Sequence, residues 1–262
     1  MEILKKYLYT NFPKQFGYYV HYREVVLHRF KKILLNLNFN IYFSTKDQDR
    51  WVAEDIFKFK ENGFFVDLAA TSGIIDNNTY FLEKKLNWRG ICIEPNEYFF
   101  KKLKQNRAAI CINDCVDDCE KTVEFINDGG LSGILDTDTD NNYEMRNEKI
   151  QKYKKRSLVE YKKTKTLTSI LDENNAPLII DYLSLDIEGA EERALVSFDF
   201  EKYRFLSMTI ERPSKKLHDI LINNGYVFVK HFKVDSFYLH NSIKKNVNIN
   251  FETYIELPKK KW

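Results

Sequence analysis

From residue 64 onward, short apolar runs alternate with segments whose apolar residues recur at helical spacing. Each short run has the continuous apolar character of a buried parallel strand: FFVDLAA, RGICIEP, AAICIND, IDYLSLDIEG and FLSMTIER. The segments between and after them are predicted to be helices: NNTYFLEKKL, EYFFKKLKQN, TLTSILDEN, EERALVSFDF and SKKLHDILINNGY. Gly225 is placed to end the last helix, and YVFVKHF and DSFYLH then read as a closing pair of strands.

This alternation predicts an α/β domain. Repeated strand–helix–strand units imply a parallel sheet with helices on both faces. We therefore expect a Rossmann-like, mostly parallel seven-stranded sheet with an antiparallel edge hairpin. The predicted domain covers residues 48–262, and residues 1–47 are predicted to be an N-terminal helical extension, in which VVLHRFKKILLNL has helical spacing. That helix is expected to pack on the main domain or on a second copy of the chain, as in a homodimer.

Two segments interrupt the alternation. KTVEFIN has the alternating pattern of an exposed antiparallel strand. The Gly- and Asp-rich stretch from Gly129 to about Gln151 is predicted to be a substrate lid, because long loops in compact domains are often functional. A lysine-rich run then reads as a solvated helix or loop face; it comprises Lys152, Lys154, Lys155, Arg156, Lys162, Lys163 and Lys165.

Composition narrows the classes of function. The 41 basic and 38 acidic residues nearly cancel, so charge gives no argument for a nucleic-acid partner. No stretch has the length of a membrane span, and the N-terminus lacks the apolar core of a signal peptide. Four cysteines are expected to be reduced thiols of a cytoplasmic protein: Cys92, Cys111, Cys115 and Cys119. The last three recur every four residues, but without a Cys-x-x-Cys pair they favour zinc only weakly.

Ligands of open parallel sheets bind beyond the carboxyl ends of the strands, so the polar residues there form the candidate site. The first strand runs through Asp67 into a turn of small residues, including Ala69 and Gly73, where a ligand can approach the backbone. Glu94 ends the second strand and is placed to bind a ribose hydroxyl pair. Asp114 follows the third strand, where an adenine edge could lie.

The cofactor that suits this layout is a nucleoside without phosphates. The chain has no G-x-G-x-x-G turn to cradle a pyrophosphate and no G-x-x-x-x-G-K-[ST] loop to hold a triphosphate. S-adenosylmethionine is a cationic nucleoside of this kind, and Asp67 and Asp186 are suitable neighbours for its ammonium and sulfonium charges. We therefore predict an S-adenosylmethionine site.

Three carboxylates are expected to converge at the ends of the fourth and fifth strands. Asp186 and Glu188 are two residues apart in what reads as extended chain, so their side chains would share a face, and Glu211 ends the neighbouring strand. An alcohol that accepts a methyl group must lose its proton, which a carboxylate can take alone or with the help of a divalent ion. These three residues are therefore the predicted catalytic groups and the candidate ligands of Mg²⁺ or Mn²⁺.

Each candidate also has a purely structural interpretation. Asp67 could cap a loop, Glu94 could pair with a surface lysine, and Asp114 could be a turn residue. Glu188 could cap the helix that follows it, and Glu211 could form an ion pair with the arginine after it or with a lysine.

Several segments together resemble the FkbM-like family of S-adenosylmethionine-dependent methyltransferases. They are QDRWVAEDIF, FFVDLAATSGIIDNNTYFLEKKLNWRGICIEPN, IDYLSLDIEGAE and the regions of Glu211 and DSFY, and the resemblance runs from about Gln48 to His240. It implies a class I methyltransferase fold and O-methylation of sugars or natural products. It also implies cofactor contacts from Asp67, Gly73, Asn78, Glu94 and Asp186, with Glu188 and Glu211 near the acceptor.

One position departs from the family pattern, whose first turn usually reads D-[IL]-G-A-x-x-G. Ala69 replaces the first glycine, and its methyl group could crowd the cofactor. The expected function is S-adenosylmethionine-dependent O-methylation of a sugar hydroxyl on a glycan or sugar nucleotide. The alternatives are a catalytically inactive binding protein with the same fold, for which Ala69 is the motive, and a nucleic-acid methyltransferase, for which the motive is the lysine-rich run.

Overall fold

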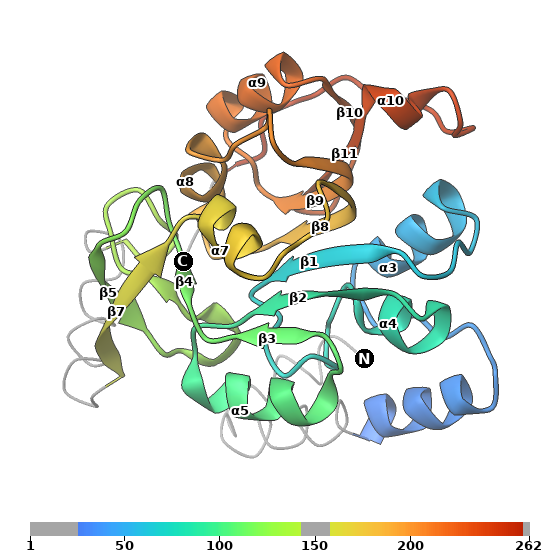
Figure 1. Ribbon diagram of the computed structural model, residues 1–262, viewed down its shortest axis with the longest axis horizontal. Coiled ribbons are helices and arrows are strands. Elements are labelled where there is room, and N and C mark those ends of the chain that lie inside the picture. The colour runs from blue at the N-terminus through green and yellow to red at the C-terminus, as the bar shows by residue number, and fades with distance from the viewer. Residues whose placement is uncertain (1–25, 143–157, 259–262) are drawn as a thin grey trace, which may run out of the picture.

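The computed structural model describes residues 26–142 and 158–258. Its centre is a seven-stranded sheet with the order β10-β11-β9-β8-β1-β2-β3 (Figure 1). The strands are β1 (Phe64–Leu68), β2 (Arg89–Ile93), β3 (Ile110–Ile112), β8 (Ile179–Leu185), β9 (Arg204–Glu211), β10 (Tyr226–Phe232) and β11 (Asp235–His240).

Only β11 runs against its neighbours: it pairs antiparallel with β9 and with β10, while the other pairs are parallel. The β10–β11 hairpin lies at one edge, and its second strand pairs with β9. The predicted mostly parallel sheet with an antiparallel edge hairpin is confirmed. This strand order is that of the class I methyltransferase fold.

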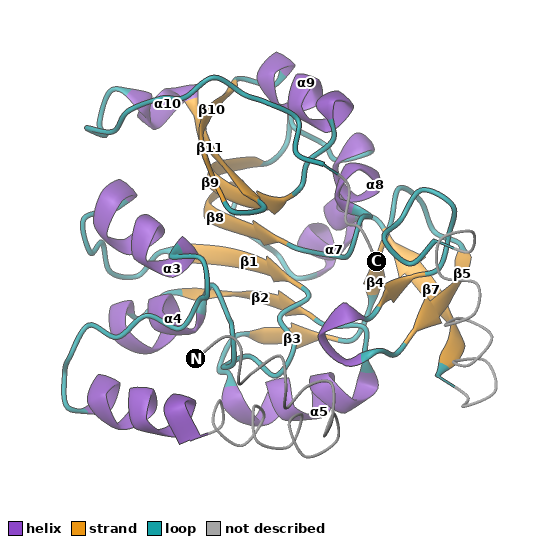
Figure 2. Cartoon of the chain, turned by 180° about the vertical axis from the view of Figure 1, so that it is seen from behind, coloured by secondary structure: helices purple, strands orange, loops and turns teal. Residues whose placement is uncertain are grey.

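Helices cover both faces of the sheet (Figure 2). The first hydrophobic core lies between the sheet and helices α7 (Leu167–Glu173), α8 (Glu191–Val196) and α9 (Lys215–Asn223). The second hydrophobic core lies between the sheet and α4 (Tyr80–Leu86), α5 (Glu97–Asn106) and the π-helical turn Trp51–Ile56, which follows α3 (Gln48–Arg50). Successive residues of β1 point to opposite cores, Phe65 to the second and Val66 to the first, as the pleat of a strand requires. The last helix is α10 (Asn241–Lys244).

Local signals explain where the helices begin and end. The side chain of Asn96 accepts hydrogen bonds from Tyr98 N and Phe99 N and so caps α5. Gly225, with φ of +83°, follows α9 as predicted. The prediction of a helix from Asn77 was too long, since α4 begins at Tyr80. The residues before it instead bond to the end of β1.

A second sheet of four strands lies beside the carboxyl ends of β1 and β2, in the order β4-β7-β5-β6 (Figure 1). Its strands are β4 (Cys115–Val116), β5 (Thr122–Ile126), β6 (Gly133–Ile134) and β7 (Val159–Lys165). The predicted antiparallel strand KTVEFIN is β5, which pairs antiparallel with β6 and β7.

The lysine-rich run was misread. Lys162, Lys163 and Lys165 belong to strand β7, not to a helix or loop, because the segment pairs with β5. The residues of the run between 152 and 156 lie outside the described residues. The first half of the predicted lid forms a 3₁₀ turn (Gly129–Leu131) and β6, and its remainder beyond residue 142 is likewise outside the description.

Residues 26–36 form a helix, and the chain after it runs along α4. There the rings of Tyr42 and Phe81 have centroids 4.6 Å apart, as do those of Phe43 and Tyr80. No helix in the described part of the chain is long and apolar enough to cross a membrane.

Candidate active site

Three cavities lie around the carboxyl ends of β1, β8 and β9. The inner cavity lies between the ends of β1 and β2 and the second sheet. The outer cavity shares Leu68, Ala69, Thr71 and Gly130 with it and extends to Asp186. The acidic cavity lies beyond, between residues 137–142 and the end of β9.

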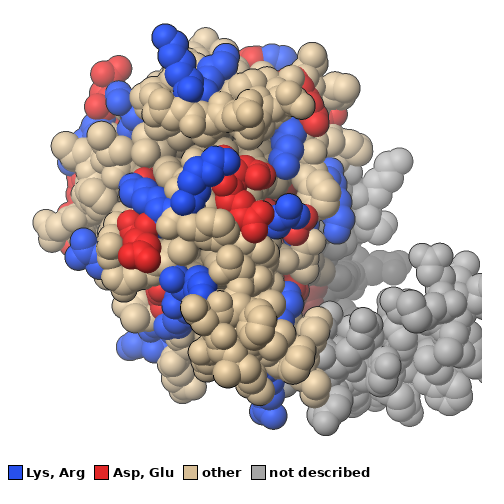
Figure 3. Space-filling view, turned by 90° about the vertical axis from the view of Figure 1, so that its right-hand side faces the viewer, with Lys and Arg blue, Asp and Glu red and all other residues tan. Residues whose placement is uncertain are grey.

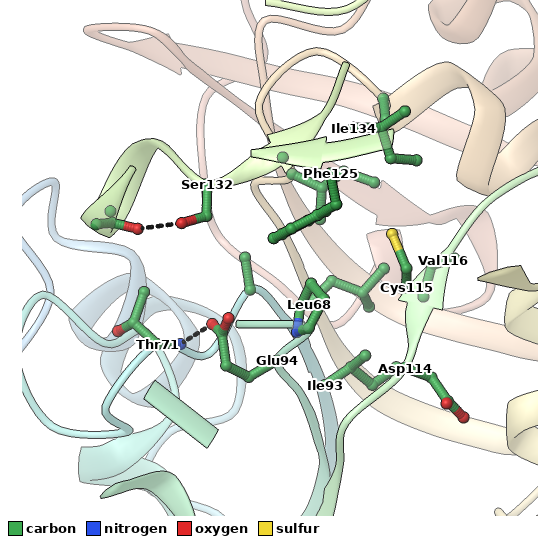
Figure 4. Close-up of a pocket in the computed structure, with 17 residues that line it drawn as sticks. Leu68, Thr71, Ile93, Glu94, Asp114, Cys115, Val116, Phe125, Ser132 and Ile134 are labelled. Carbon is green, nitrogen blue, oxygen red and sulfur yellow. Dashed lines mark hydrogen bonds between the residues drawn. The ribbon is translucent and has the colours of Figure 1, made fainter. Parts of the chain in front are cut away.

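The inner cavity has apolar walls and a polar rim (Figure 4). Its walls include Leu68, Ile93, Val116, Phe125 and Ile134. Such a lining accepts a flat aromatic ring, while a few polar groups at the rim fix its orientation.

The first turn passes between the inner and outer cavities. Ala69 there has φ of +62°, a left-handed conformation that glycine adopts without strain and that costs an alanine about 1 kcal/mol or more. Gly73 also has positive φ, and a Cβ on it would lie 2.7 Å from side-chain atoms of Leu103 and Arg107. The turn therefore tolerates a methyl group at residue 69 with strain, whereas residue 73 has no room for one.

Asp67 ties this turn to the chain that follows it. Its carboxylate is buried and accepts hydrogen bonds from Asn77 Nδ2 at 2.9 Å and Thr79 Oγ1 at 2.7 Å. Burial raises the pKa of Asp67, while the nearby guanidinium of Arg107 opposes the rise. Arg107 is buried too and pairs with Glu83 at 2.8 Å. Asp67 thus makes the hydrogen bonds expected of an aspartate that caps a loop. It also lines the outer cavity.

Asn78 also lines the outer cavity, and its Nδ2 donates to Ser184 Oγ at 3.0 Å. This contact joins the loop before α4 to strand β8. Asn78 and Asp67 therefore reach the same cavity from two elements.

Glu94 lies at the rim of the inner cavity, beside Thr71 of the first turn (Figure 4). Its carboxylate accepts hydrogen bonds from Thr71 N at 2.8 Å and Asn96 N at 2.7 Å. Burial raises the pKa of Glu94 to about 7, against the lowering effect of these two N–H donors. Glu94 is only 3% exposed, and its carboxylate is held by backbone N–H donors. It is therefore not the surface residue that the alternative of a lysine pair requires.

Asp114 occupies the rim on the side of the second sheet. Its carboxylate is directed away from the centre of the inner cavity (Figure 4) and pairs with Lys165 at 3.2 Å. This placement is compatible with the turn interpretation, and an adenine contact from this side chain would require a different rotamer.

The carboxylates after β8 are arranged differently from the prediction. Strand β8 ends at Leu185, and Glu188 has φ of +58°, so Asp186 and Glu188 do not lie in extended chain. The premise that their side chains share a strand face was wrong because the chain turns after Leu185. Helix α8 is capped by Ala190 without a side-chain bond, so the described geometry does not make Glu188 its N-cap.

The turn instead distributes the carboxylates over two groups that share Glu211. One group is Asp186, Glu191 and Glu211; the other is Asp140, Glu188 and Glu211, and in each group one oxygen per residue lies within 4.8 Å of the others. The three predicted residues are therefore close together, but not as one trio. Burial and then the charge of Glu211 raise the pKa of Asp186 well above its usual value.

Sequence reasoning missed Glu191 and Asp140 at this place. Glu191 accepts hydrogen bonds from Ile187 N at 2.9 Å and Gly189 N at 3.3 Å, and burial raises its pKa to about 8. Asp140 lies in the predicted lid, and its N–H donates to Glu188 O at 2.9 Å. Both belong to segments that look like an ordinary helix start and a polar loop in the sequence, which explains why they were missed.

Two cations approach the same carboxylates. Lys46 Nζ lies 3.0 Å from Asp235 Oδ1 and 3.8 Å from Glu211 Oε1. Arg212 Nη1 lies 2.8 Å from Glu211 Oε1, so the ion pair of the structural interpretation is present. Lys46 comes from the predicted N-terminal extension, and it reaches the site because Gln48 Nε2 bonds to the other oxygen of Asp235.

Comparison with known proteins gives one match to a family. Residues 67–228 match the sequence profile of the methyltransferase FkbM domain. No curated protein sequence matches the chain significantly.

Solved structures resemble the chain only distantly. M. capricolum TrmK in complex with S-adenosyl-homocysteine shares 9% identity with a TM-score of 0.36, over 83% of this chain and 74% of that one. A precorrin-6y C5,15-methyltransferase from Geobacter metallireducens GS-15 shares 10% with a TM-score of 0.37, over 75% and 88%. The METTL16 MTase domain shares 11% with a TM-score of 0.39, over 73% and 65%, so the chain spans just under two thirds of that structure.

Proposed function

The chain belongs to the FkbM methyltransferase family, and from this premise we propose that it transfers the methyl group of S-adenosylmethionine to a hydroxyl group, with a sugar as the acceptor. The observation that carries the proposal is that the cavities are adjacent. The inner and outer cavities share the first turn, and the outer cavity ends at Asp186, which is grouped with Glu191 and Glu211 at the acidic cavity.

In the proposed complex the adenine ring occupies the apolar inner cavity. Glu94 accepts hydrogen bonds from the ribose hydroxyls, since its oxygens are already oriented by Thr71 N and Asn96 N. The amino-acid part of the cofactor lies in the outer cavity beside Asp67, Asn78 and Asp186. The carboxylates there suit its ammonium and sulfonium charges.

The acceptor is proposed to enter through the acidic cavity. Its oxygen attacks the methyl carbon while the carbon–sulfur bond breaks and its electron pair stays on sulfur, which yields S-adenosylhomocysteine. The hydroxyl proton passes to a carboxylate, for which Glu211 is the proposed base, with Asp186 and Glu188 beside it. Six carboxylates and two arginines line this cavity, which favours a neutral sugar over the anionic diphosphate of a sugar nucleotide.

Mg²⁺ or Mn²⁺ would find oxygen ligands in either carboxylate group. Lys46 and Arg212 already place positive charge beside Glu211, so no step of the proposed transfer depends on a metal. The same activity assay with and without a chelator decides whether a metal contributes.

The experiment that tests the proposal is calorimetric titration with S-adenosylhomocysteine, followed by an assay of its release from S-adenosylmethionine. The assay uses a panel of neutral sugars, sugar nucleotides and RNA. Binding and turnover with a neutral sugar support the proposal, and methylation of RNA alone would replace it with the nucleic-acid alternative. Absence of binding would favour an inactive binding protein, the alternative for which Ala69 is the motive.

Changing Ala69 to glycine tests whether its methyl group weakens cofactor binding. The substitution removes a methyl group from the shared turn and relieves the strain of a left-handed alanine. We expect binding of S-adenosylhomocysteine to tighten about two- to tenfold, and the free energy of unfolding to rise by up to about 1 kcal/mol after the added freedom of glycine in the unfolded chain is subtracted. The measurements are calorimetric titration and urea denaturation.

Lys233 provides the matched control, because it has φ of +59° in the turn between β10 and β11, outside all three cavities. Lys233→Gly is expected to affect stability without affecting cofactor affinity. Equal or weaker cofactor binding by Ala69→Gly would mean that the methyl group does not crowd the cofactor.

Cofactor affinity is expected to depend on pH through Glu94, whose pKa is about 7 in the unliganded protein. The ionised carboxylate accepts ribose hydrogen bonds better than the acid does, so affinity should rise as pH increases through about 7. By linkage, binding should release a proton at pH below that value. Titrations across this pH range in wild type and Glu94→Gln measure the effect. A pH dependence that persists unchanged in the variant would assign it to another group.

A further inference from the structure

The helix of residues 26–36 has a buried side and an opposite, exposed apolar side. His28 and Leu35 on one side are buried against the domain, with exposed fractions of 5% and 7%. On the opposite side an outward stripe consists of Val26, Phe30, Ile33 and Leu37, whose exposed fractions are 45%, 56%, 55% and 63%. Their spacing places them on one line along the helix and into the turn after it.

Packing against residues 38–142 and 158–258, the described remainder of the domain, does not explain this outward stripe. The helix is fastened through its other side, where Lys31 Nζ donates to Tyr42 O at 2.7 Å and Leu35 joins the second core. Exposed apolar residues are ordinary when scattered, but a contiguous stripe marks a surface that meets another apolar phase. Leu27 at 45% exposure widens it on one flank.

The surroundings of the outward stripe are basic. Arg29 and Lys32 lie on its other flank, and the chain has no Asp or Glu between Glu24 and Asp47. Lys85 of α4 donates to Asn38 O at 2.9 Å, immediately beyond the stripe. Within the described residues 26–45, Arg29, Lys31 and Lys32 give a net charge of +3, and there is no carboxylate. The described segment that carries the stripe is therefore positively charged.

Charge decides between the partners that could cover the stripe. An antiparallel pair of two such helices would bring the Arg29 and Lys32 flanks of both copies together, and the segment has no carboxylate to pair with them. An anionic lipid surface offers both an apolar phase for the stripe and negative charge for its flank. Helices that lie in a bilayer interface combine Phe, Leu and Ile on one side with Lys and Arg beside them.

We propose that the helix of residues 26–36 attaches the protein to an anionic membrane surface, with Val26, Phe30, Ile33 and Leu37 inserted between the lipid headgroups. Figure 3 views the side of the molecule that bears this helix, and charged side chains of both signs occupy its upper part while its lower part is largely uncharged. Figures 1 and 2 show the helix on the side of the sheet away from β5 and β7.

The test is flotation of the full chain with vesicles of phosphatidylcholine, with and without phosphatidylglycerol. The wild-type protein is expected to float with the anionic vesicles only, and less in high salt because the ionic part is screened. Phe30→Ser combined with Ile33→Ser should lower partitioning at least about tenfold. Arg29→Gln and Lys32→Gln should each lower it about fivefold.

Tyr161→Ser is the matched control, because Tyr161 is 76% exposed on β7, far from the helix in sequence and on the second sheet. It should float like the wild type. The affinity of each variant for S-adenosylhomocysteine, measured without vesicles, reports that the fold is intact and keeps this test separate from the proposed reaction.

Three results would overturn the proposal. They are absence of wild-type flotation with anionic vesicles, unchanged flotation of the Phe30→Ser/Ile33→Ser variant, and a change from dimer to monomer in that variant by light scattering. The last result would assign the stripe to a second copy of the chain.

Discussion

Glu94→Ala is expected to weaken binding of S-adenosylhomocysteine about a hundredfold or more. The side chain is proposed to accept two ribose hydrogen bonds, and a hydrogen bond to a charged acceptor contributes about 1.5–3 kcal/mol. Its loss also leaves Thr71 N and Asn96 N without the acceptor that orients the first turn. Calorimetric titration at a pH above 7, where Glu94 is ionised, measures the full effect.

Two further variants distinguish recognition from general damage. Glu94→Gln keeps the size of the side chain and one carbonyl acceptor, so its affinity should lie between those of wild type and Glu94→Ala. Glu97→Ala removes a carboxylate that lies three residues further on in α5, where the side chain is 54% exposed, and should bind like wild type. Wild-type affinity of Glu94→Ala would place the ribose elsewhere and remove the proposed cofactor position.

Glu211→Gln is expected to lower turnover about a thousandfold while cofactor affinity changes little. General bases contribute about 10²–10⁴-fold, and an amide cannot take the hydroxyl proton. Glu211 is the residue that both carboxylate groups share, and it lines the acidic cavity rather than the outer one. The measurement is the rate of S-adenosylhomocysteine release with the sugar found in the panel, together with calorimetric titration of the cofactor.

The ion pairs of Glu211 require a control for stability. The glutamine variant loses its charge pairs with Arg212 and Lys46, so thermal unfolding of the variant should be measured beside its activity. Glu256→Gln changes an exposed carboxylate that lines the same cavity and should retain turnover. Full turnover in Glu211→Gln would transfer the role of base to Asp186 or Glu188.

Much of the fold could be predicted from the sequence because buried parallel strands must be continuously apolar. The five parallel strands β1, β2, β3, β8 and β9 and the edge hairpin were found in this way, and the helix stop at Gly225 is a property of a residue that adopts positive φ easily. Strand β7 was missed because its sequence, VEYKKTK, is rich in lysine. Pairing with β5 overrides that local preference.

The carboxylate site likewise combines features that the sequence predicts with features that only tertiary packing decides. The ends of β1, β2, β8 and β9 could be located in the sequence, so Asp67, Glu94, Asp186 and Glu211 could be named as candidates. The spacing of Asp186 and Glu188 suggested that their side chains share one strand face. The chain turns after Leu185, so they do not. Glu191 and Lys46 reach Glu211 only through long-range packing, from the start of α8 and from a segment 165 residues away in the chain.

The sequence by itself thus determined the strands of the central sheet, the helices between them and the acidic residues at the strand ends, since apolar runs and their periodicity are local properties. The tertiary structure alone decided which carboxylates stand together and which cations offset them, because charges act through space rather than along the chain. It likewise decided that the apolar residues Val26, Phe30, Ile33 and Leu37 face outward, since periodicity identifies an apolar side of a helix but not what that side meets.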